Sequence, residues 1–287
     1  MNNSNQENFY PIYITCKDYT VSGEEFELLL DPEMDLLITT PKPDLDRLPS
    51  YYKSEDYISH TDSKNSITDK IYQSVKKKML VKKLSWIDSH FPEKRKLLDI
   101  GAGTGEFLLT AKNNGWKVKG VEPDENAREL AKQKGIKLVP DSSKFKAEKF
   151  DVITMWHVFE HVYDLKNQII ELEQLLKKDG LLIIAVPNFK SYDALYYKEH
   201  WAAFDVPRHL WHFSRKSFEK LFSGTSFSQV DEKPLLFDSF YVSLLSEKYK
   251  TKKNNFLKAF LIGLKSNLKA KKSLEYSSIA YFFRKSS

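Results

Sequence analysis

The sequence has little cysteine and no long apolar run. Cys16 is the single cysteine among 287 residues, which excludes a disulfide framework and a cluster of thiolate metal ligands. No apolar stretch approaches the roughly 18 residues that a membrane-spanning helix requires. The N-terminal stretch MNNSNQENFY is polar and lacks the basic and apolar regions of a secretory signal. We therefore expect a cytoplasmic protein without a bound metal.

The sequence also lacks internal repeats and low-complexity tracts, and its positive charge is local. The formal net charge is +6, and eight lysines lie between residues 249 and 274, where no acidic residue occurs. The rest of the chain is therefore close to neutral. A local cluster of lysines does not make the whole protein a nucleic-acid binder, so DNA is not an expected partner.

The pattern of the chain divides it near residue 70. Residues 1–70 read as an irregular extension with a short hairpin, because prolines interrupt the segment TTPKPDLDRLPSYY. Residues 68–90 have apolar side chains at helical spacing. From residue 96 onward, strand and helix patterns alternate, and the stretch LLIIAVPN (181–188) is apolar enough for burial on both faces. This order predicts an α/β domain with a parallel sheet over residues 71–287.

Three glycines follow the first strand of this domain. Gly101, Gly103 and Gly105 stand in KLLDIGAGTGEF, between a strand pattern and a helix pattern. Glycine permits a tight turn and lets a ligand approach the backbone closely. A dinucleotide fingerprint would have glycine where Glu106 stands, and a carboxylate there repels a pyrophosphate but suits an ammonium and a sulfonium. The spacing favours S-adenosylmethionine over NAD.

Two later positions fit the same kind of ligand. Glu122 ends the second strand pattern, about 20 residues past the glycines, where an acidic side chain can accept both ribose hydroxyls. Asp141 and Ser142 follow the third strand pattern and are placed to meet an adenine edge.

Four segments together resemble a known family. LLDIGAGTGEF, VKGVEPDENA, FDVITMWHVFEHV and GLLIIAVPN are similar in order and spacing to the motifs of class I S-adenosylmethionine-dependent methyltransferases, and resemble most the ubiquinone-biosynthesis O-methyltransferase branch. The resemblance implies a Rossmann-like, seven-stranded, mostly parallel sheet with helices on both faces and an antiparallel last strand near 277–284. It also implies a set of cofactor-binding residues: Asp99, Gly101, Ala102, Gly103, Gly105, Glu122, Pro123, Asp141, Ser142 and His157.

The opening C-x-D-x-x-VSGE resembles bacterial relatives that carry a short ribbon with cysteine pairs before the methyltransferase domain. Here Cys16 stands alone, and LDPEMDLL occupies the place of a second pair. The extension is therefore expected to bind no zinc.

The acceptor side is expected among histidines and aromatic residues. Five of the seven histidines lie between residues 157 and 212, beyond the fourth and fifth strand patterns, where ligands bind in open α/β sheets. His161, His157 and His209 are candidate general bases, although the imidazoles of the WHVFEHV loop can equally pack or cap the next helix. An aromatic insert, residues 191–213, supplies the expected acceptor contacts: Tyr197, Trp201, Arg208, His209 and His212. About half of its aromatic residues are expected to be core, and Arg208 can instead pair with Asp205.

Residues 254–272 predict a basic amphipathic helix. Such a helix can contact a membrane or another anionic surface, or it can pack its apolar face on the domain and leave its lysines in solvent, which is the commoner arrangement.

The expected function is methylation of a small-molecule or lipid-like acceptor. Methylation of RNA or protein, a non-catalytic cofactor-binding scaffold and a nicotinamide oxidoreductase are the alternatives. No RNA-binding module and no N-P-P-Y-type amino-methylation signature is visible in the sequence, which weighs against a macromolecular acceptor.

Overall fold

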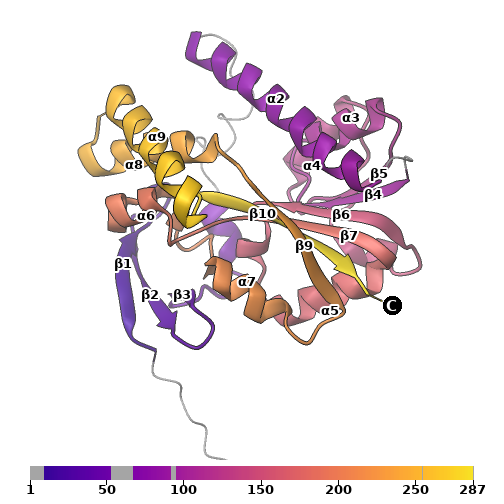
Figure 1. Ribbon diagram of the computed structural model, residues 1–287, viewed down its shortest axis with the longest axis horizontal. Coiled ribbons are helices and arrows are strands. Elements are labelled where there is room, and N and C mark those ends of the chain that lie inside the picture. Colours follow the sequence, from indigo (N-terminus) through magenta and orange to yellow (C-terminus); the bar gives the residue numbers. More distant parts are fainter. Residues whose placement is uncertain (1–9, 53–66, 92–94, 254, 287) are drawn as a thin grey trace, which may run out of the picture. The chain divides into compact units, whose positions relative to one another are not determined.

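The computed structural model describes residues 10–52, 67–91, 95–253 and 255–286 (Figure 1). The chain forms two compact units, and each is described here by itself. Unit 1 comprises the described parts of residues 1–58, 187–221 and 238–277, and unit 2 comprises those of 59–186, 222–237 and 278–287. Within the described residues, none of the helices combines the length and apolarity needed to cross a membrane.

Unit 2 contains a six-stranded sheet in the order β5-β4-β6-β7-β10-β9. Strands β5, β4, β6 and β7 pair in parallel, whereas β9 and β10 pair antiparallel. The strands are β4 (Lys96–Ile100), β5 (Lys117–Val121), β6 (Phe150–Trp156), β7 (Leu176–Pro187), β9 (Phe227–Pro234) and β10 (Ser278–Lys285). The mostly parallel sheet and the antiparallel last strand predicted from sequence are confirmed.

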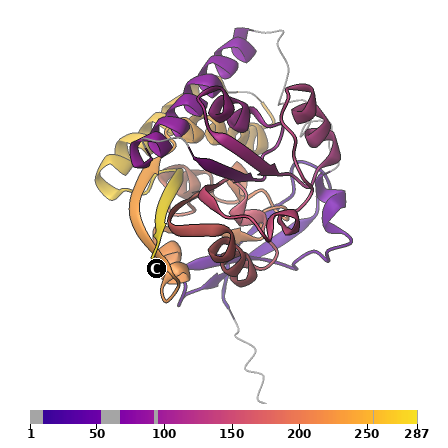
Figure 2. The same cartoon turned by 90° about the vertical axis from the view of Figure 1, so that its right-hand side faces the viewer.

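Helices cover both faces of this sheet. In Figure 1, α2, α3 and α4 lie on one side of it and α5 on the other, and Figure 2 presents its β4–β5 end to the viewer. Their bounds are α2 (Ile67–His90), α3 (Glu106–Asn113), α4 (Glu125–Gln133) and α5 (Leu165–Leu175). Buried side chains such as Leu84, Leu97 and Leu108 join α2, β4 and α3 in one apolar core. Burial of such side chains is the main stabilising contribution to a fold of this kind.

The seventh strand expected from the family resemblance is reduced to one residue. Residues 136–140 form a single parallel bridge, in which the Val139 N–H donates to Gly120 O at 3.1 Å and Val139 O accepts from Glu122 N at 2.9 Å. Pro140 follows at once and has no N–H to extend the ladder. The segment therefore lies beside β5 without forming a full strand.

Unit 1 contains a four-stranded sheet in the order β1-β2-β3-β8. Its strands are β1 (Ile12–Lys17), β2 (Glu25–Asp31), β3 (Leu36–Thr40) and β8 (Trp211–His212), all paired antiparallel. Its helices are α6 (Tyr192–Tyr197), α7 (Arg215–Phe222, whose last residue falls in unit 2), α8 (Asp238–Thr251) and α9 (Phe256–Ser273), with 3-10 turns η1 (Leu48–Tyr52), η4 (Lys198–His200) and η5 (Ala202–Phe204).

The N-terminal segment is more regular than the sequence suggested. The expected hairpin is formed by β1 and β2, and β3 then pairs with β8 of the aromatic insert. The signal that was missed is LLITT, a short run of apolar and β-branched residues before Pro41 that fits a strand. The boundary at residue 70 falls within α2 and stays a prediction.

Candidate functional site

The glycine turn connects β4 to α3 in unit 2, as predicted. Gly101, Gly103 and Gly105 have φ angles of 72°, 52° and 75°, all in the left-handed region that side chains with a Cβ rarely adopt. The N–H groups of Gly101 and Ala102 donate to the carbonyl oxygen of Val121, the last residue of β5, at 2.8 and 2.9 Å. The turn is thereby tied to the carboxyl end of the neighbouring strand.

Gly101 and Gly103 meet different surroundings. A Cβ placed on Gly101 would lie 2.3 Å from the Cγ2 atom of Val158, which follows β6. A Cβ on Gly103 would meet no described atom within 4 Å. Gly101 is therefore required for packing between two loops, whereas Gly103 leaves open space beside the backbone, where a ligand can approach.

Glu122 is fixed at the carboxyl end of β5 by two backbone donors. Its Oε2 atom accepts from Gly103 N at 2.8 Å, and its Oε1 atom accepts from Asp124 N at 2.9 Å. Burial raises the pKa of this carboxyl and outweighs the two hydrogen bonds, which lower it. Each carboxylate oxygen has a second lone pair, so Glu122 can accept further donors such as vicinal hydroxyls without losing its anchors.

Asp99 is buried on β4, directly before the glycine turn. Its Oδ1 atom accepts a 2.6 Å hydrogen bond from the Thr154 hydroxyl on β6, where the two residues are register partners. Burial raises the pKa of Asp99 from 3.8 to about 7, although the Thr154 hydrogen bond and the Lys83 charge oppose the shift. The carboxyl is therefore partly protonated near neutral pH.

The raised pKa of Asp99 predicts a pH dependence of stability. Between the unfolded pKa and the folded pKa, the folded state holds a proton on Asp99 that the unfolded state has lost, so the contribution of Asp99 to the free energy of unfolding falls as pH rises from about 4 to about 7. Asp99→Asn keeps an oxygen for Thr154 but carries no charge. We expect the variant to lack this decline and to be more stable than wild type at pH 8 by about 1–3 kcal/mol. Urea unfolding at several pH values measures it, and parallel pH profiles for the two proteins would contradict it.

Glu106 begins α3, but its surroundings differ from those assumed in the sequence argument. Its carboxylate lies 2.6 Å from Lys76 Nζ of α2 and 3.4 Å from Lys134 Nζ. Burial alone would raise the pKa of Glu106, yet the two lysines outweigh it and hold that pKa below its ordinary value. Because two cations neutralise this carboxylate, the argument that it repels a pyrophosphate was wrong. The glycine spacing is the part of the argument that remains.

The residues expected at the adenine edge serve partly as local caps. Asp141 caps η2 (Ser142–Phe145), because its Oδ1 atom accepts from Ser143 N at 3.0 Å. The hydroxyl of Ser142 donates to Glu171 of α5. Both residues lie beyond the residue 136–140 segment, at the same edge of the sheet as Glu122. Pro123 is exposed next to Glu122, and its carbonyl accepts from Arg128 at 2.6 Å.

The loop after β6 contains two of the candidate bases. His157 has a φ of 57°, and its N–H donates to Ala185 O of β7 at 2.9 Å. This left-handed turn directs the chain so that Val158 fills the space beside Gly101. His157 Nδ1 lies 3.5 Å from the buried carboxylate of Glu160. His161 ends η3 (Phe159–His161) and is half-buried. Sequence reasoning assigned no role to Glu160 and missed Val158, although both stand in the quoted motif.

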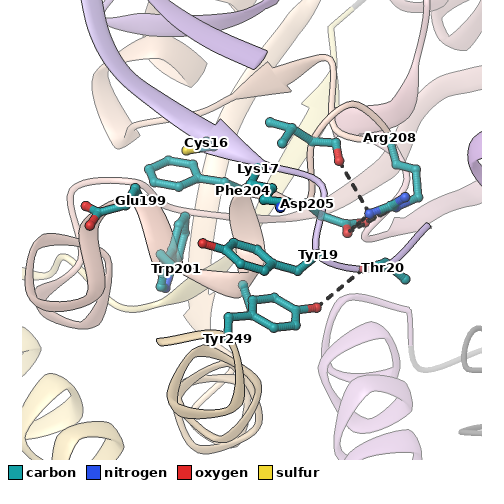
Figure 3. Close-up of a pocket in the computed structure, with 12 residues that line it drawn as sticks. Cys16, Lys17, Tyr19, Thr20, Glu199, Trp201, Phe204, Asp205, Arg208 and Tyr249 are labelled. Carbon is teal, nitrogen blue, oxygen red and sulfur yellow. Dashed lines mark hydrogen bonds and ion pairs between the residues drawn. The ribbon is translucent and has the colours of Figure 1, made fainter. Parts of the chain in front are cut away.

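Arg208 is a structural cation of unit 1 and not a group presented to an acceptor. Its guanidinium donates to Asp18 Oδ1 at 2.9 Å, to Asp205 Oδ1 at 2.7 Å and to the Tyr51 carbonyl at 3.0 Å. Figure 3 shows the contact with Asp205. The side chain is 1% exposed. Asp18 also accepts from the N–H groups of residues 20, 21 and 22, which form the turn between β1 and β2. The pairing of Arg208 with Asp205 was foreseen as an alternative, whereas Asp18 was missed.

The cavity beside Arg208 is too small for an acceptor. Cys16, Tyr19, Glu199, Trp201 and Tyr249 are among the residues around it in Figure 3. Its volume of about 10 Å³ admits roughly one water molecule. Burial raises the pKa of the Cys16 thiol to about 12, with a smaller contribution from Glu199, so this thiol stays protonated.

Other predicted acceptor contacts are also bonded within unit 1. Trp201 is buried, and its Nε1 donates to Asp193 at 2.8 Å. Tyr197 is buried, and burial followed by the charge of Glu247 raises the pKa of its phenol. These two residues belong to the apolar core of unit 1. Their predicted contact with an acceptor is therefore replaced by a structural role, which agrees with the expectation that about half of the aromatic residues are core.

His209 and His212, two of the three histidines of the insert, differ in role. The Thr39 hydroxyl donates its one hydrogen to His209 O at 2.6 Å. Because that hydrogen is used, the same hydroxyl oxygen accepts from His212 Nε2 at 3.0 Å. Burial holds the pKa of His212 well below its ordinary value, so this ring is neutral and joins β8 to β3. His209 Nδ1 donates to Ala203 O at 2.8 Å, which leaves Nε2 as the nitrogen that can accept a proton. His209 therefore remains the candidate base of unit 1.

Comparisons with known proteins bear on the family and on the fold of this chain. A family model described as "Methyltransferase domain" matches residues 72–232, which is more than half of the chain. Ubiquinone biosynthesis O-methyltransferase from Actinobacillus pleuropneumoniae serotype 5b (strain L20) is 34% identical over 108 residues, covering 33% of this chain and 46% of the relative. The protein of that name from Pelagibacter ubique (strain HTCC1062) is 38% identical over 107 residues, covering 34% and 45%. The chain thus spans about half the length of the curated relatives it matches.

A solved structure extends the likeness over most of the chain. The cyclopropane synthase MmaA2 from Mycobacterium tuberculosis aligns with a TM-score of 0.53 over 86% of this chain and 99% of that one, at 14% sequence identity. At this identity the comparison establishes the fold alone.

Proposed function

Because the chain belongs to the methyltransferase-domain family, with the fold of class I S-adenosylmethionine-dependent methyltransferases, we propose that it methylates a small-molecule or lipid-like acceptor. The observation that carries the proposal is the pairing of Glu122 with Gly103. A buried carboxylate is held by backbone donors at the carboxyl end of β5, and the glycine that donates to it has open space where a Cβ would stand. Ligands of open α/β sheets bind at this edge.

These residues fit the cofactor that the family uses. S-Adenosylmethionine, when bound, supplies a methyl group on a sulfonium sulfur. In this proposal, Glu122 accepts the ribose hydroxyls, and the Gly103 backbone admits the ligand without a side chain in the way. Asp99, with its raised pKa, lies directly before the turn and would be favoured in its ionised form by a cationic group.

Other residues that were predicted to bind the cofactor have supporting roles in the proposal. Asp141 and Ser142 lie after the residue 136–140 segment and border the adenine in the proposal, and Pro123 flanks Glu122. Ala102 and Gly105 maintain the turn, since the Gly105 N–H donates to Ala102 O at 2.9 Å. The geometry of each residue is compatible with its proposed role.

The acceptor is proposed to be deprotonated by a histidine. His161 and His157 follow β6 in unit 2, and His209 in unit 1 has the tautomer that a base needs. Glu160, 3.5 Å from His157 Nδ1, would stabilise that ring once it is protonated. The relatives named ubiquinone biosynthesis O-methyltransferases favour an oxygen acceptor on a small molecule. General-base catalysis of this kind contributes about 10²–10⁴-fold to a rate.

The proposal is tested by following radiolabelled methyl groups from S-adenosylmethionine into a cell extract. The extract is separated into organic-soluble small molecules, protein and RNA after incubation. Label in the small-molecule fraction supports the proposal, and label confined to protein or RNA overturns it. Binding of S-adenosylhomocysteine without transfer to any fraction identifies a scaffold instead. A Glu122→Gln variant run in parallel shows whether any transfer depends on the site described above.

A further inference from the structure

Helix α9 of unit 1 turns its large apolar side chains away from the core. Six of them are between 38% and 71% exposed: Phe256, Leu257, Phe260, Leu261, Leu264 and Leu268. At 100° per residue they occupy one continuous strip of the helix surface. The expectation that such a helix packs its apolar face on the domain is therefore wrong for this chain.

Small residues on the opposite side explain this orientation. Ala259, Gly263, Ser266 and Ala270 are the buried positions that face α8 and α6, together with Ile262. A Cβ on Gly263 would lie 3.0 Å from the Phe240 backbone, so α8 approaches too closely for a larger side chain. The Ser266 hydroxyl donates to buried Asp193 at 2.6 Å and fixes the rotation of the helix. The Leu and Phe strip is consequently held outward.

Lysines border this apolar strip. Lys258, Lys265, Lys269 and Lys272 fall along one of its edges, and Lys271 lies within it near the C-terminal end. Lys265 and Lys269 extend over the Tyr192 ring at 5.2 and 4.2 Å, while Lys258 pairs with Glu247. Residues 249–274 contain eight lysines, no acidic residue and no arginine. The exposed surface of α9 therefore combines apolar side chains with a single sign of charge.

We propose that α9 binds the surface of an anionic lipid bilayer. The Phe and Leu side chains enter the boundary between headgroups and acyl chains, and the lysines meet lipid phosphates, as in other interfacial helices with a basic polar side. A second copy of the chain is disfavoured, because a two-fold contact would bring the same lysines face to face. A nucleic acid is disfavoured, because the centre of the surface is apolar. The proposal goes beyond the proposed function and holds whichever acceptor is methylated.

The single cysteine allows insertion to be measured directly. Cys16 is buried, so Leu261→Cys provides one accessible thiol for an environment-sensitive dye on the apolar strip. Ile170→Cys on α5, half exposed in unit 2, is the matched control. On vesicles containing about a third phosphatidylglycerol in phosphatidylcholine, we expect a blue shift at position 261 and none at 170. Equal shifts at both positions, or none at 261, overturn the proposal.

Charge is tested by a matched pair of triple variants. Lys265→Gln, Lys271→Gln and Lys272→Gln together should reduce vesicle binding at least about tenfold, because each lysine near an anionic surface contributes to binding. Lys77→Gln, Lys78→Gln and Lys82→Gln on α2 remove equal charge and should leave binding unchanged. Both triples are checked for an unchanged melting temperature and S-adenosylhomocysteine affinity. Equal losses in the two triples would indicate a delocalised charge effect, and a protein that dimerises through α9 without binding vesicles would assign this surface to a second copy. Either result overturns the proposal.

Discussion

Arg208→Met should lower the free energy of unfolding by about 3–5 kcal/mol, the usual cost of leaving a buried ion pair with one partner. The substitution removes the hydrogen bonds to Asp18, Asp205 and the Tyr51 carbonyl while retaining most of the apolar stem. Asp18 is fully buried and would keep its charge without its cation. The turn between β1 and β2, which Asp18 also holds, should loosen with it.

Arg47→Met is the matched control for this prediction. Arg47 pairs with Glu24 at 2.6 Å, but their side chains are 61% and 40% exposed. Exposed pairs contribute about 0–1 kcal/mol, so this variant should unfold almost as the wild type does. Urea unfolding followed by circular dichroism compares the two. Equal destabilisation would show that Arg208 is not the buried anchor described here, and loss of cofactor affinity in Arg208→Met alone would place it at the ligand after all.

Gly101→Ala should destabilise unit 2 by about 2–5 kcal/mol, the sum of left-handed backbone strain and overpacking. The new Cβ would lie 2.3 Å from Val158 Cγ2 at a φ of 72°. In Gly103→Ala the new Cβ meets no described atom within 4 Å, so there is no clash. Only the left-handed backbone strain remains, and it should lower the free energy of unfolding by about 1–2 kcal/mol. We expect Gly103→Ala instead to weaken S-adenosylhomocysteine binding, since the methyl group projects into the space left for a ligand.

A double variant separates the clash from the strain. In Gly101→Ala with Val158→Ala, the two γ-methyl groups nearest the new Cβ are gone, so part of the lost stability should return. The melting temperatures of Gly101→Ala, Val158→Ala, the double variant and the wild type give the coupling between positions 101 and 158. Additive losses would mean that Val158 does not fill the space beside Gly101.

Local sequence patterns predicted the secondary structure and the glycine turn of unit 2, because these features depend on residues that are close together in the sequence. Alternating strand and helix signals led to the parallel sheet, and the glycine spacing located the turn at Gly101 to Gly105. The single bridge at Val139 was not predicted from sequence. The segment lies beside β5, and Pro140, which follows Val139, has no N–H to extend the pairing. In unit 1, α9 was assigned correctly as a helix, but its apolar side was not predicted to face outward. That orientation depends on the close approach of α8 to Gly263, a contact between segments that periodicity does not record.

Charges were the least predictable part of the candidate site. Glu106 was interpreted as a free carboxylate, yet Lys76 lies 30 residues before it and Lys134 lies 28 after it, and both reach it in space. Arg208 was predicted to contact the acceptor or to pair with Asp205, whereas its other partner, Asp18, is 190 residues away in the sequence. By contrast, the position of Glu122 directly after β5 was predicted from sequence, because its spacing from the glycines is set by one βαβ unit.

Glu122 also provides the most direct test of the central claim, that this edge of unit 2 binds S-adenosylmethionine. Calorimetry should show binding of S-adenosylhomocysteine and none of NADH. Glu122→Gln should weaken that binding by about 1.5–3 kcal/mol, the range for hydrogen bonds to a charged group, while Glu125→Gln, an exposed carboxylate three residues along, should not change it. Circular dichroism confirms that both variants remain folded. Unchanged affinity in a folded Glu122→Gln protein, or binding of NADH in place of S-adenosylhomocysteine, would contradict the account.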